Sequence, residues 1–137
     1  ETSMRAPLMF AAPMIDGVEA NAVTQSLAEF IDIYPTLCDL AGLPKPEHLE
    51  GKSLLPVLRD PETSVRKAAI GRFGKGETIR TDRYRYSVYR DGKGKQTGHM
   101  LYDHDSDPDE NINVADDPAY DEAVATLGRQ LEDGRGK

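Results

Sequence analysis

Apolar residues recur at intervals of three and four in an early part of the chain, and this period is typical of a helix. Asp32 is suited to the helix start, and Pro35 is tolerated in a first turn. Gly42 supplies a left-handed stop. We therefore predict a regular helix over residues 32–41. The apolar positions that carry the period are Leu27, Phe30, Ile31, Tyr34, Leu37, Cys38, Leu40 and Ala41.

From residue 67 the apolar period changes to two, which indicates short antiparallel strands. Strands are predicted over 69–73, 77–81, 84–89 and 100–103, joined by turns rich in glycine and aspartate. A helical stripe follows, carried by Tyr120, Val124, Leu127 and Leu131. The predicted C-terminal half, residues 67–137, is thus a small four-stranded antiparallel sheet backed by a C-terminal helix, an α+β arrangement.

The first apolar run, residues 6–13, is uncharged and bounded by prolines, and it is typical of a strand buried in the middle of a sheet. Such a strand needs neighbours on both sides, and the sequence offers none nearby. We therefore expect residues 1–66 to be the end of a truncated larger domain made of a strand, a helix and a connection. The first strand is expected to be poorly paired, or to pair with another copy by self-association.

Charge and composition exclude several classes of function. The chain has 24 acidic and 17 basic residues and a net charge of -7, which argues against a nucleic-acid partner. No apolar run approaches the roughly 20 residues that cross a bilayer, so no membrane partner is expected. The single cysteine, Cys38, lies among apolar residues and is interpreted as a buried, inert thiol.

No catalytic or metal centre can be assembled from the residues alone. The acidic run 103–110 has Pro108 and Val114 where a calcium-binding loop of the EF-hand type needs Gly and Glu, so a solvated turn is preferred. The three histidines, His48, His99 and His104, lack metal-ligand spacing, and no metal site is predicted. No serine or cysteine has the sequence context of a nucleophile.

Arginines and tyrosines alternate along the third predicted strand and the turn before it, a mixture that binds anions or stacks on sugars in some proteins. We prefer an interpretation in which the tyrosines pack in the sheet and the arginines are solvated. The residues concerned are Arg80, Arg83, Arg85 and Arg90 with Tyr84, Tyr86 and Tyr89.

Four blocks, in this order, resemble the C-terminal third of formylglycine-dependent sulfatases of the alkaline-phosphatase superfamily, and most closely the iduronate-2-sulfatase branch. The first is 1–9, which resembles the strand after the family's sulfate-contacting lysine. The second is 30–44, Phe-Ile-Asp-Ile-Tyr-Pro-Thr-Leu-Cys-Asp-Leu-Ala-Gly-Leu-Pro, and the third is 49–56. The fourth combines 79–86 with 101–103 and 107–111. The resemblance implies an α/β sulfatase whose main domain ends near residue 66.

The resemblance implies a sulfuric ester hydrolase that acts on sulfated sugars with a calcium ion and a formylglycine. The formylglycine of this family arises from Cys-x-Pro-Ser-Arg, and no Pro-Ser-Arg occurs in the chain. Calcium and formylglycine are therefore expected in the missing upstream part, with no catalytic residue and no cofactor on this fragment, which should be inactive alone.

By resemblance, the C-terminal sheet has a structural role and its loops wall the substrate pocket. The loop 74–80 and two residues, Arg80 and His99, are the substrate-side candidates. The implied partners are the rest of the main domain and a sulfated carbohydrate, and the implied location is periplasmic or extracellular. Two alternatives stay open: a phosphonate or phosphate ester hydrolase of the same superfamily, and a non-enzymatic interaction module.

Overall fold

The computed structural model describes residues 5–18 and 20–134, which form two compact units. One unit is Pro7–Lys67, called here the helical unit. The other, called the sheet unit, runs from Ala68 to the end of the described chain and includes residues 5 and 6. Each unit is described by itself.

The helical unit contains a 3-10 turn, η1 (Phe30–Asp32), followed directly by helix α1 (Ile33–Leu40), and a short helix α2 (Leu55–Arg59). The predicted helix over 32–41 is confirmed, but it begins two residues earlier because η1 precedes it. Gly42 ends α1 with a φ of 64°, and the Leu43 amide then donates to the Cys38 carbonyl at 2.8 Å. This is the glycine stop that the sequence predicts.

The segment 6–13 forms no strand within the described chain, which agrees with the expectation that it would be poorly paired. Residues 6–12 carry no helix or strand, and a turn begins at Pro13. A strand is defined by hydrogen bonds to a neighbour, and none of the four strands of the chain pairs with this segment. An apolar composition favours an extended strand but does not supply its partner.

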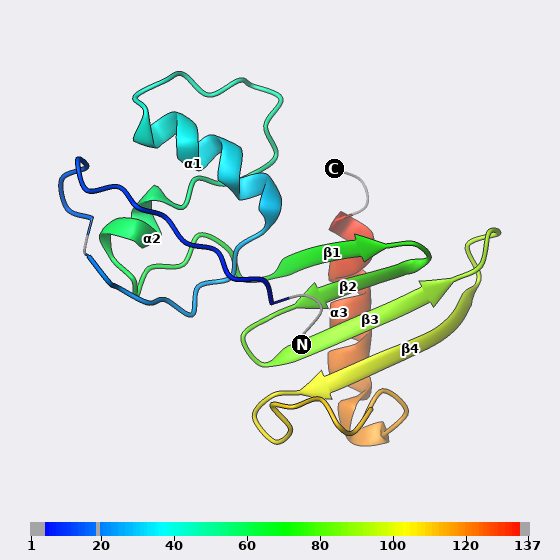
Figure 1. Cartoon of the computed structure of the whole chain (residues 1–137). Coiled ribbons are helices and arrows are strands. Elements are labelled where there is room, and N and C mark those ends of the chain that lie inside the picture. Colours follow the sequence, from blue (N-terminus) through cyan, green and yellow to red (C-terminus); the bar gives the residue numbers. More distant parts are fainter. Residues whose placement is uncertain (1–4, 19, 135–137) are drawn as a thin grey trace. The chain divides into compact units, whose positions relative to one another are not determined.

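The sheet unit is built on four antiparallel strands in the order β1-β2-β3-β4, as Figure 1 shows. Their bounds are β1 (Ala69–Phe73), β2 (Gly76–Arg80), β3 (Tyr84–Arg90) and β4 (Gln96–Asp103). All four predicted strands are confirmed, and β4 extends four residues further back than predicted. The extension is possible because the Asp91 carboxylate accepts from the amides of Lys93 and Lys95 at 2.8 and 2.9 Å and closes a tight turn.

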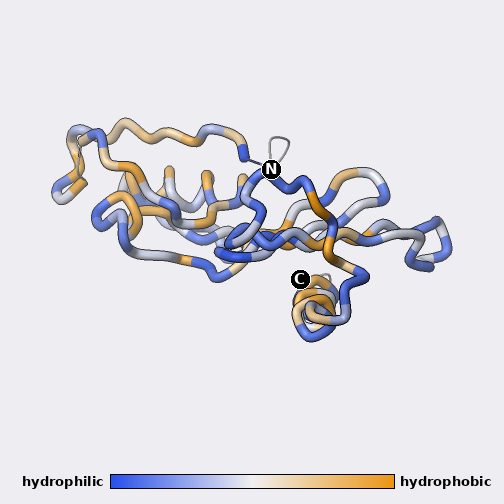
Figure 2. Tube along the Cα trace, turned by 90° about the horizontal axis from the view of Figure 1, so that it is seen from below, coloured by the Kyte–Doolittle hydropathy of each residue, from blue (hydrophilic) through white to orange (hydrophobic). Residues whose placement is uncertain are grey.

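One face of the sheet is covered by helix α3 (Asp121–Asp133), which a 3-10 turn, η2 (Pro118–Tyr120), precedes. Figure 2 shows the helix on one side of the sheet. The Asp117 carboxylate accepts from the Ala119 amide at 2.9 Å and caps this helical segment. The predicted C-terminal helix is confirmed. The buried apolar core between sheet and helix comprises Ile79, Tyr86, Val88, Leu101, Ala115, Leu127 and Leu131.

The opposite face of the sheet follows from the strand register, because successive side chains of a strand point to opposite faces. Ile79, Tyr86 and Leu101 are direct cross-strand partners on the helix-covered face. Their neighbours Arg80, Arg85 and Tyr102, also direct partners, therefore lie on the other face, called here the open face. The two faces thus carry different chemistry: an apolar core on one, and cations with aromatic rings on the other.

The outer edge of β4 is closed by Asn113, which lies in the connection to η2. Its side-chain oxygen accepts from the Leu101 amide at 2.9 Å, and its side-chain nitrogen donates to the His99 carbonyl at 3.3 Å. The next amide, that of Val114, donates to the Leu101 carbonyl at 2.9 Å. Three backbone groups of an edge strand are thereby satisfied without another strand.

Candidate functional site

Arg80, the first of the two predicted substrate-side residues, is the last residue of β2 and lies on the open face. Its cross-strand partners are Ala69 of β1 and Arg85 of β3. It is half-buried at the end of the sheet where β2 passes into the turn before β3. Arg80 and Arg85 therefore bring two guanidinium groups to neighbouring positions on the same face.

His99, the second predicted residue, lies in β4 on the face that α3 covers. Its Nε2 is 3.0 Å from Asp116 Oδ1, and its Nδ1 is 3.3 Å from the Tyr86 hydroxyl. Tyr86 is only 3% exposed, and its burial raises the pKa of the hydroxyl. His99 thus bridges the sheet core and the loop before η2.

Arg80 and His99 are not brought together. In each of the strands β2, β3 and β4, the residue aligned with Arg80 and the residue aligned with His99 are an odd number of positions apart. Because successive side chains alternate between faces, Arg80 and His99 lie on opposite faces of the sheet. A substrate pocket on one face of the sheet would therefore contact only one of these two side chains.

Arg83 and Asp103 form the most developed polar cluster of the sheet unit, and the sequence analysis missed it as a pair. Arg83 donates from Nε and Nη2 to the two carboxylate oxygens of Asp103 at 2.8 and 2.7 Å. The Tyr120 hydroxyl donates to the same carboxylate at 3.3 Å, and the Asp105 amide at 3.2 Å. These donors hold the pKa of Asp103 below its usual range, and the bond to Asp103 raises the pKa of Arg83.

A groove of about 700 Å³ lies beside this cluster, between the β2–β3 turn and α3. Thr81, Arg83 and Tyr84 line it from the turn. Two acidic groups, Asp103 and Asp105, already bind Arg83, whose distance to the second carboxylate is 3.1 Å. The guanidinium is therefore neutralised, and the groove does not favour an anionic ligand.

The acidic run 103–110 forms turns, as predicted, but the interpretation that its carboxylates are solvated is wrong for Asp103 and Glu110. Asp103 is 3% exposed and holds Arg83, as described above. Asp107 accepts from the Ile112 amide at 2.7 Å and closes the loop. The side chain of Glu110 is 5% exposed and pairs with Arg85 and with His104, the latter at 2.8 Å. These groups bind cations and amides of the chain itself.

The interpretation of the arginines as solvated is likewise wrong for Arg85 and Arg90, whose side chains are 13% and 22% exposed. The side chain of Arg83 is 50% exposed and agrees with the prediction. All three arginines form ion pairs, and Arg90 pairs with Glu132 of α3 at 3.2 Å. The signal that the sequence lacks is the partner, because each acidic residue lies 20 or more positions away and only the folded register brings it near.

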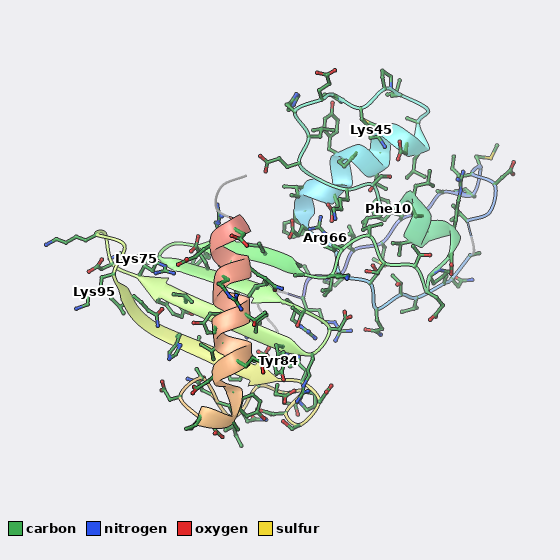
Figure 3. The ribbon with its side chains drawn as sticks, turned by 180° about the vertical axis from the view of Figure 1, so that it is seen from behind. Phe10, Lys45, Arg66, Lys75, Tyr84 and Lys95 are labelled. Carbon is green, nitrogen blue, oxygen red and sulfur yellow. The ribbon has the colours of Figure 1, made fainter. Side chains whose placement is uncertain are left out.

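The helical unit has its own polar cluster, centred on Asp32, which is fully buried. Its carboxylate accepts from the amides of Glu29 and Lys52 at 2.8 and 2.7 Å and pairs with Arg66. Figure 3 labels Arg66. Asp32 was predicted to cap α1, and instead it lies at the third position of the 3-10 turn and accepts the amide before that turn.

Two neighbours of Asp32 extend this cluster. Thr36 donates to the Asp32 carbonyl at 2.5 Å and accepts from the Leu54 amide at 2.8 Å, so α1 is tied to the segment before α2. Gly51 passes so close that a Cβ there would lie 2.0 Å from the Ile31 carbonyl oxygen. The blocks 30–44 and 49–56, which carry the sequence resemblance, are therefore the two sides of one buried contact.

Residues 5–18 and 20–134 contain no group of three or more His, Cys, Asp or Glu side chains that could hold a metal ion. Within the same residues, no helix combines the length and the apolar character that crossing a membrane requires.

Comparison with known proteins identifies the family. The family model described as "N-sulphoglucosamine sulphohydrolase, C-terminal" matches residues 1–137. Arylsulfatase K of Bos taurus is 31% identical over 144 residues, an alignment that covers 96% of this chain and 25% of that protein. The chain thus spans about a quarter of the length of this curated relative.

Solved structures agree in fold. The structure described as "BT1596, a 2-O GAG sulfatase" aligns with a TM-score of 0.60 at 35% identity, over 74% of this chain and 23% of that one. A phosphonate monoester hydrolase of Agrobacterium radiobacter aligns with a TM-score of 0.60 at 30% identity, over 77% and 24%. The mixed helix-and-sheet fold and the resemblance to sulfatases are both confirmed. The chain belongs to the N-sulphoglucosamine sulphohydrolase C-terminal family and is the C-terminal region of a sulfatase.

Proposed function

We propose that this chain is the non-catalytic C-terminal part of a sulfuric ester hydrolase that acts on sulfated sugars, in the manner of iduronate-2-sulfatases. The observation that carries the proposal is the match of a sulfatase C-terminal family model to residues 1–137. The chain supplies structure and part of a pocket wall. Its partners are the sulfatase main domain and the sulfated carbohydrate.

The described residues do not fit the two groups that sulfatase chemistry uses. They hold no cluster of metal-ligating side chains, and the only cysteine is buried within Thr-Leu-Cys-Asp-Leu, without the Pro-Ser-Arg that formylglycine formation needs. We assign calcium and formylglycine to the upstream part of the enzyme, and no catalytic step is derived from this chain.

A phosphonate or phosphate ester hydrolase is the second candidate, and the likeness to the Agrobacterium radiobacter hydrolase favours it. The sulfate ester is preferred because the family model and the curated relative are both sulfatases. A third candidate, an interaction module without an enzyme, is removed by an upstream reading frame that encodes Cys-x-Pro-Ser-Arg. A periplasmic or extracellular location remains a proposal by family resemblance.

The experiment that tests the function is turnover by the protein in which this chain follows its upstream part. We expect hydrolysis of a 2-O-sulfated uronate disaccharide, and a much slower reaction with an aryl phosphonate ester. The purified 137-residue chain should release no sulfate from a chromogenic aryl sulfate, with or without calcium. Faster hydrolysis of the phosphonate, or turnover by the chain alone above a buffer blank, would contradict the proposal.

Arg80 and His99 remain the proposed substrate-side residues, and their positions in the sheet suggest a test that separates them. Because they lie on opposite faces, we expect Arg80→Ala to raise KM for the sulfated sugar severalfold in the complete enzyme while His99→Ala does not, or the reverse. Arg129→Ala, on the solvent-exposed side of α3, is the matched control. Unchanged KM and kcat in both variants would remove both residues from the pocket.

A further inference from the structure

One residue from each strand forms a continuous row across the open face, at the end of the sheet where the β1–β2 and β3–β4 turns lie. Phe73 pairs with Gly76, Gly76 with Tyr89, and Tyr89 with Gly98. All four lie on the same face as Arg80, because Gly76 and Arg80 are four residues apart in β2. The row therefore alternates an aromatic residue with a glycine.

The glycines leave the two aromatic rings accessible from above. A Cβ at Gly76 would lie 2.9 Å from Cε1 of Tyr89, so the tyrosine ring leans over this glycine. A Cβ at Gly98 would have no other atom within 4 Å, which leaves open space on the far side of the ring. Phe73 is 91% exposed and Tyr89 42% exposed. Two exposed rings on the same face, separated by one strand with about 10 Å between their backbones, thus form an apolar strip.

Three lysines lie in the two turns next to this strip, Lys75 in the β1–β2 turn and Lys93 and Lys95 in the β3–β4 turn. The Arg90 amide donates to the Lys75 carbonyl at 3.0 Å and holds the turns together. Figure 3 shows Lys75 and Lys95 at the same end of the sheet, away from Tyr84. In a chain of net charge -7, these turns are a local concentration of positive charge.

The carboxylates near these turns are committed elsewhere. Asp91 accepts two backbone amides within its own turn. Glu77 lies 3.2 Å from Arg72, and Glu132 lies 3.2 Å from Arg90. Within the described part of the chain, no carboxylate lies within ion-pair distance of any of the three lysines. Their ammonium groups are therefore available to an external anion.

We infer that the row Phe73, Gly76, Tyr89 and Gly98, with Lys75, Lys93 and Lys95, is a binding platform for a sulfated polysaccharide. The C–H face of a sugar ring packs on an exposed aromatic ring, and sulfate groups on the same sugar reach the lysines. The choice of a sulfated sugar over other polyanions rests on the proposed function. The strip fits a ligand that is both apolar on one face and anionic at its rim.

The binding test uses the 137-residue chain and heparin as the sulfated polysaccharide. Lys75→Gln, Lys93→Gln and Lys95→Gln combined should raise the Kd about tenfold and reduce the salt dependence of binding. Lys45→Gln, Lys67→Gln and Arg129→Gln combined is the matched control, because it removes the same charge from other surfaces. The control should bind within about twofold of the parent chain.

A second variant tests the aromatic strip. Phe73→Ala should weaken heparin binding severalfold and leave binding to polyphosphate unchanged, because polyphosphate has charge and no sugar ring. The platform is overturned if both charge variants weaken binding alike, if neither does, or if the parent chain binds duplex DNA or polyphosphate as tightly as heparin. These readouts are independent of turnover, so they separate failure of the platform from failure of the proposed hydrolase function.

Discussion

The sheet unit closes over seven buried apolar residues, whereas the helical unit is organised around the buried carboxylate of Asp32. In the sheet unit, apolar burial between α3 and the sheet supplies the main stabilisation. Among the described residues of the helical unit, the buried apolar residues are Pro35, Cys38, Leu54 and Val57. The sheet unit thus has an apolar core between its sheet and its helix, whereas the helical unit depends more on buried polar contacts.

The helical unit also leaves a stripe of apolar residues exposed along η1 and α1. Phe30 is 75% exposed, Tyr34 52% and Leu37 50%. These positions are four and three residues apart and lie on one side of the helix. Exposed apolar patches of this kind mark surfaces that contact other protein. The helical period that predicts α1 is thus carried partly by residues that its own unit does not bury.

The largest expected effect is that of Asp32→Ala on the helical unit. Removing the carboxylate leaves the amides of Glu29 and Lys52 without their acceptor and takes from the buried Arg66 one of its two carboxylate partners, so it should cost about 4 kcal/mol. Segment-resolved hydrogen exchange should show loss of protection across α1 and α2 while β2 and β3 stay protected. Glu62→Ala, at an exposed position of the helical unit, is the control and should change the free energy of unfolding by no more than about 0.5 kcal/mol. Equal loss of protection in both units would contradict the comparison.

Leu101→Ala should act in the opposite region and cost about 3 kcal/mol, because Leu101 is fully buried and its removal leaves a cavity under α3. Urea denaturation followed through the tyrosines of the sheet measures the change. Ile112→Ala, at a position 65% exposed, should change the free energy of unfolding by no more than about 0.5 kcal/mol. If the two variants are equally stable, the core assigned to the sheet unit is wrong.

The smallest of the three effects belongs to Asp103. Asp103→Asn should cost about 2 kcal/mol at neutral pH, because it weakens charge-assisted bonds to Arg83. The folded-state pKa of Asp103 lies below its unfolded value, so this stabilisation is present above about pH 4 and is lost as the pH falls through the folded pKa.

The measurement for Asp103 is urea denaturation of the parent chain and the variant between pH 3 and pH 7. The two stabilities should converge as the carboxyl group becomes protonated in acid. Asp105→Asn, whose side chain is 67% exposed, should show little difference at any pH. A difference for Asp103→Asn that stays constant down to pH 3 would exclude the linkage.

The order and type of the elements in the sheet unit could be predicted from the sequence because each has a clear apolar period and turn residues. The run 6–13 forms no strand in the described chain, because the composition of a segment indicates what it can bury and does not supply its hydrogen-bond partner. The Arg83–Asp103 pair and the aromatic row were missed for one shared reason. Both depend on which residues of adjacent strands stand opposite each other, for example Tyr84 beside Asp103, and register is not readable from a single sequence.

The candidate residues Arg80 and His99 illustrate the same limit. The position of Arg80 in a strand was predicted, but His99 lies in the part of β4 that precedes the predicted strand 100–103. Their placement on opposite faces also requires the register of the three strands β2 to β4. The buried role of Asp32 was also out of reach, because it depends on Lys52 and Arg66, which lie 20 and 34 positions away.

Asn113 blocks one of the two edges of the sheet. Its side-chain amide hydrogen-bonds to the backbone of Leu101 and His99 and so occupies positions that an incoming strand would need beside β4. β1 is the other outer strand of the described sheet. An additional strand, whether from the same polypeptide or from a neighbouring molecule, would therefore have to pair with β1. The sheet can be extended at the β1 edge and not at the β4 edge.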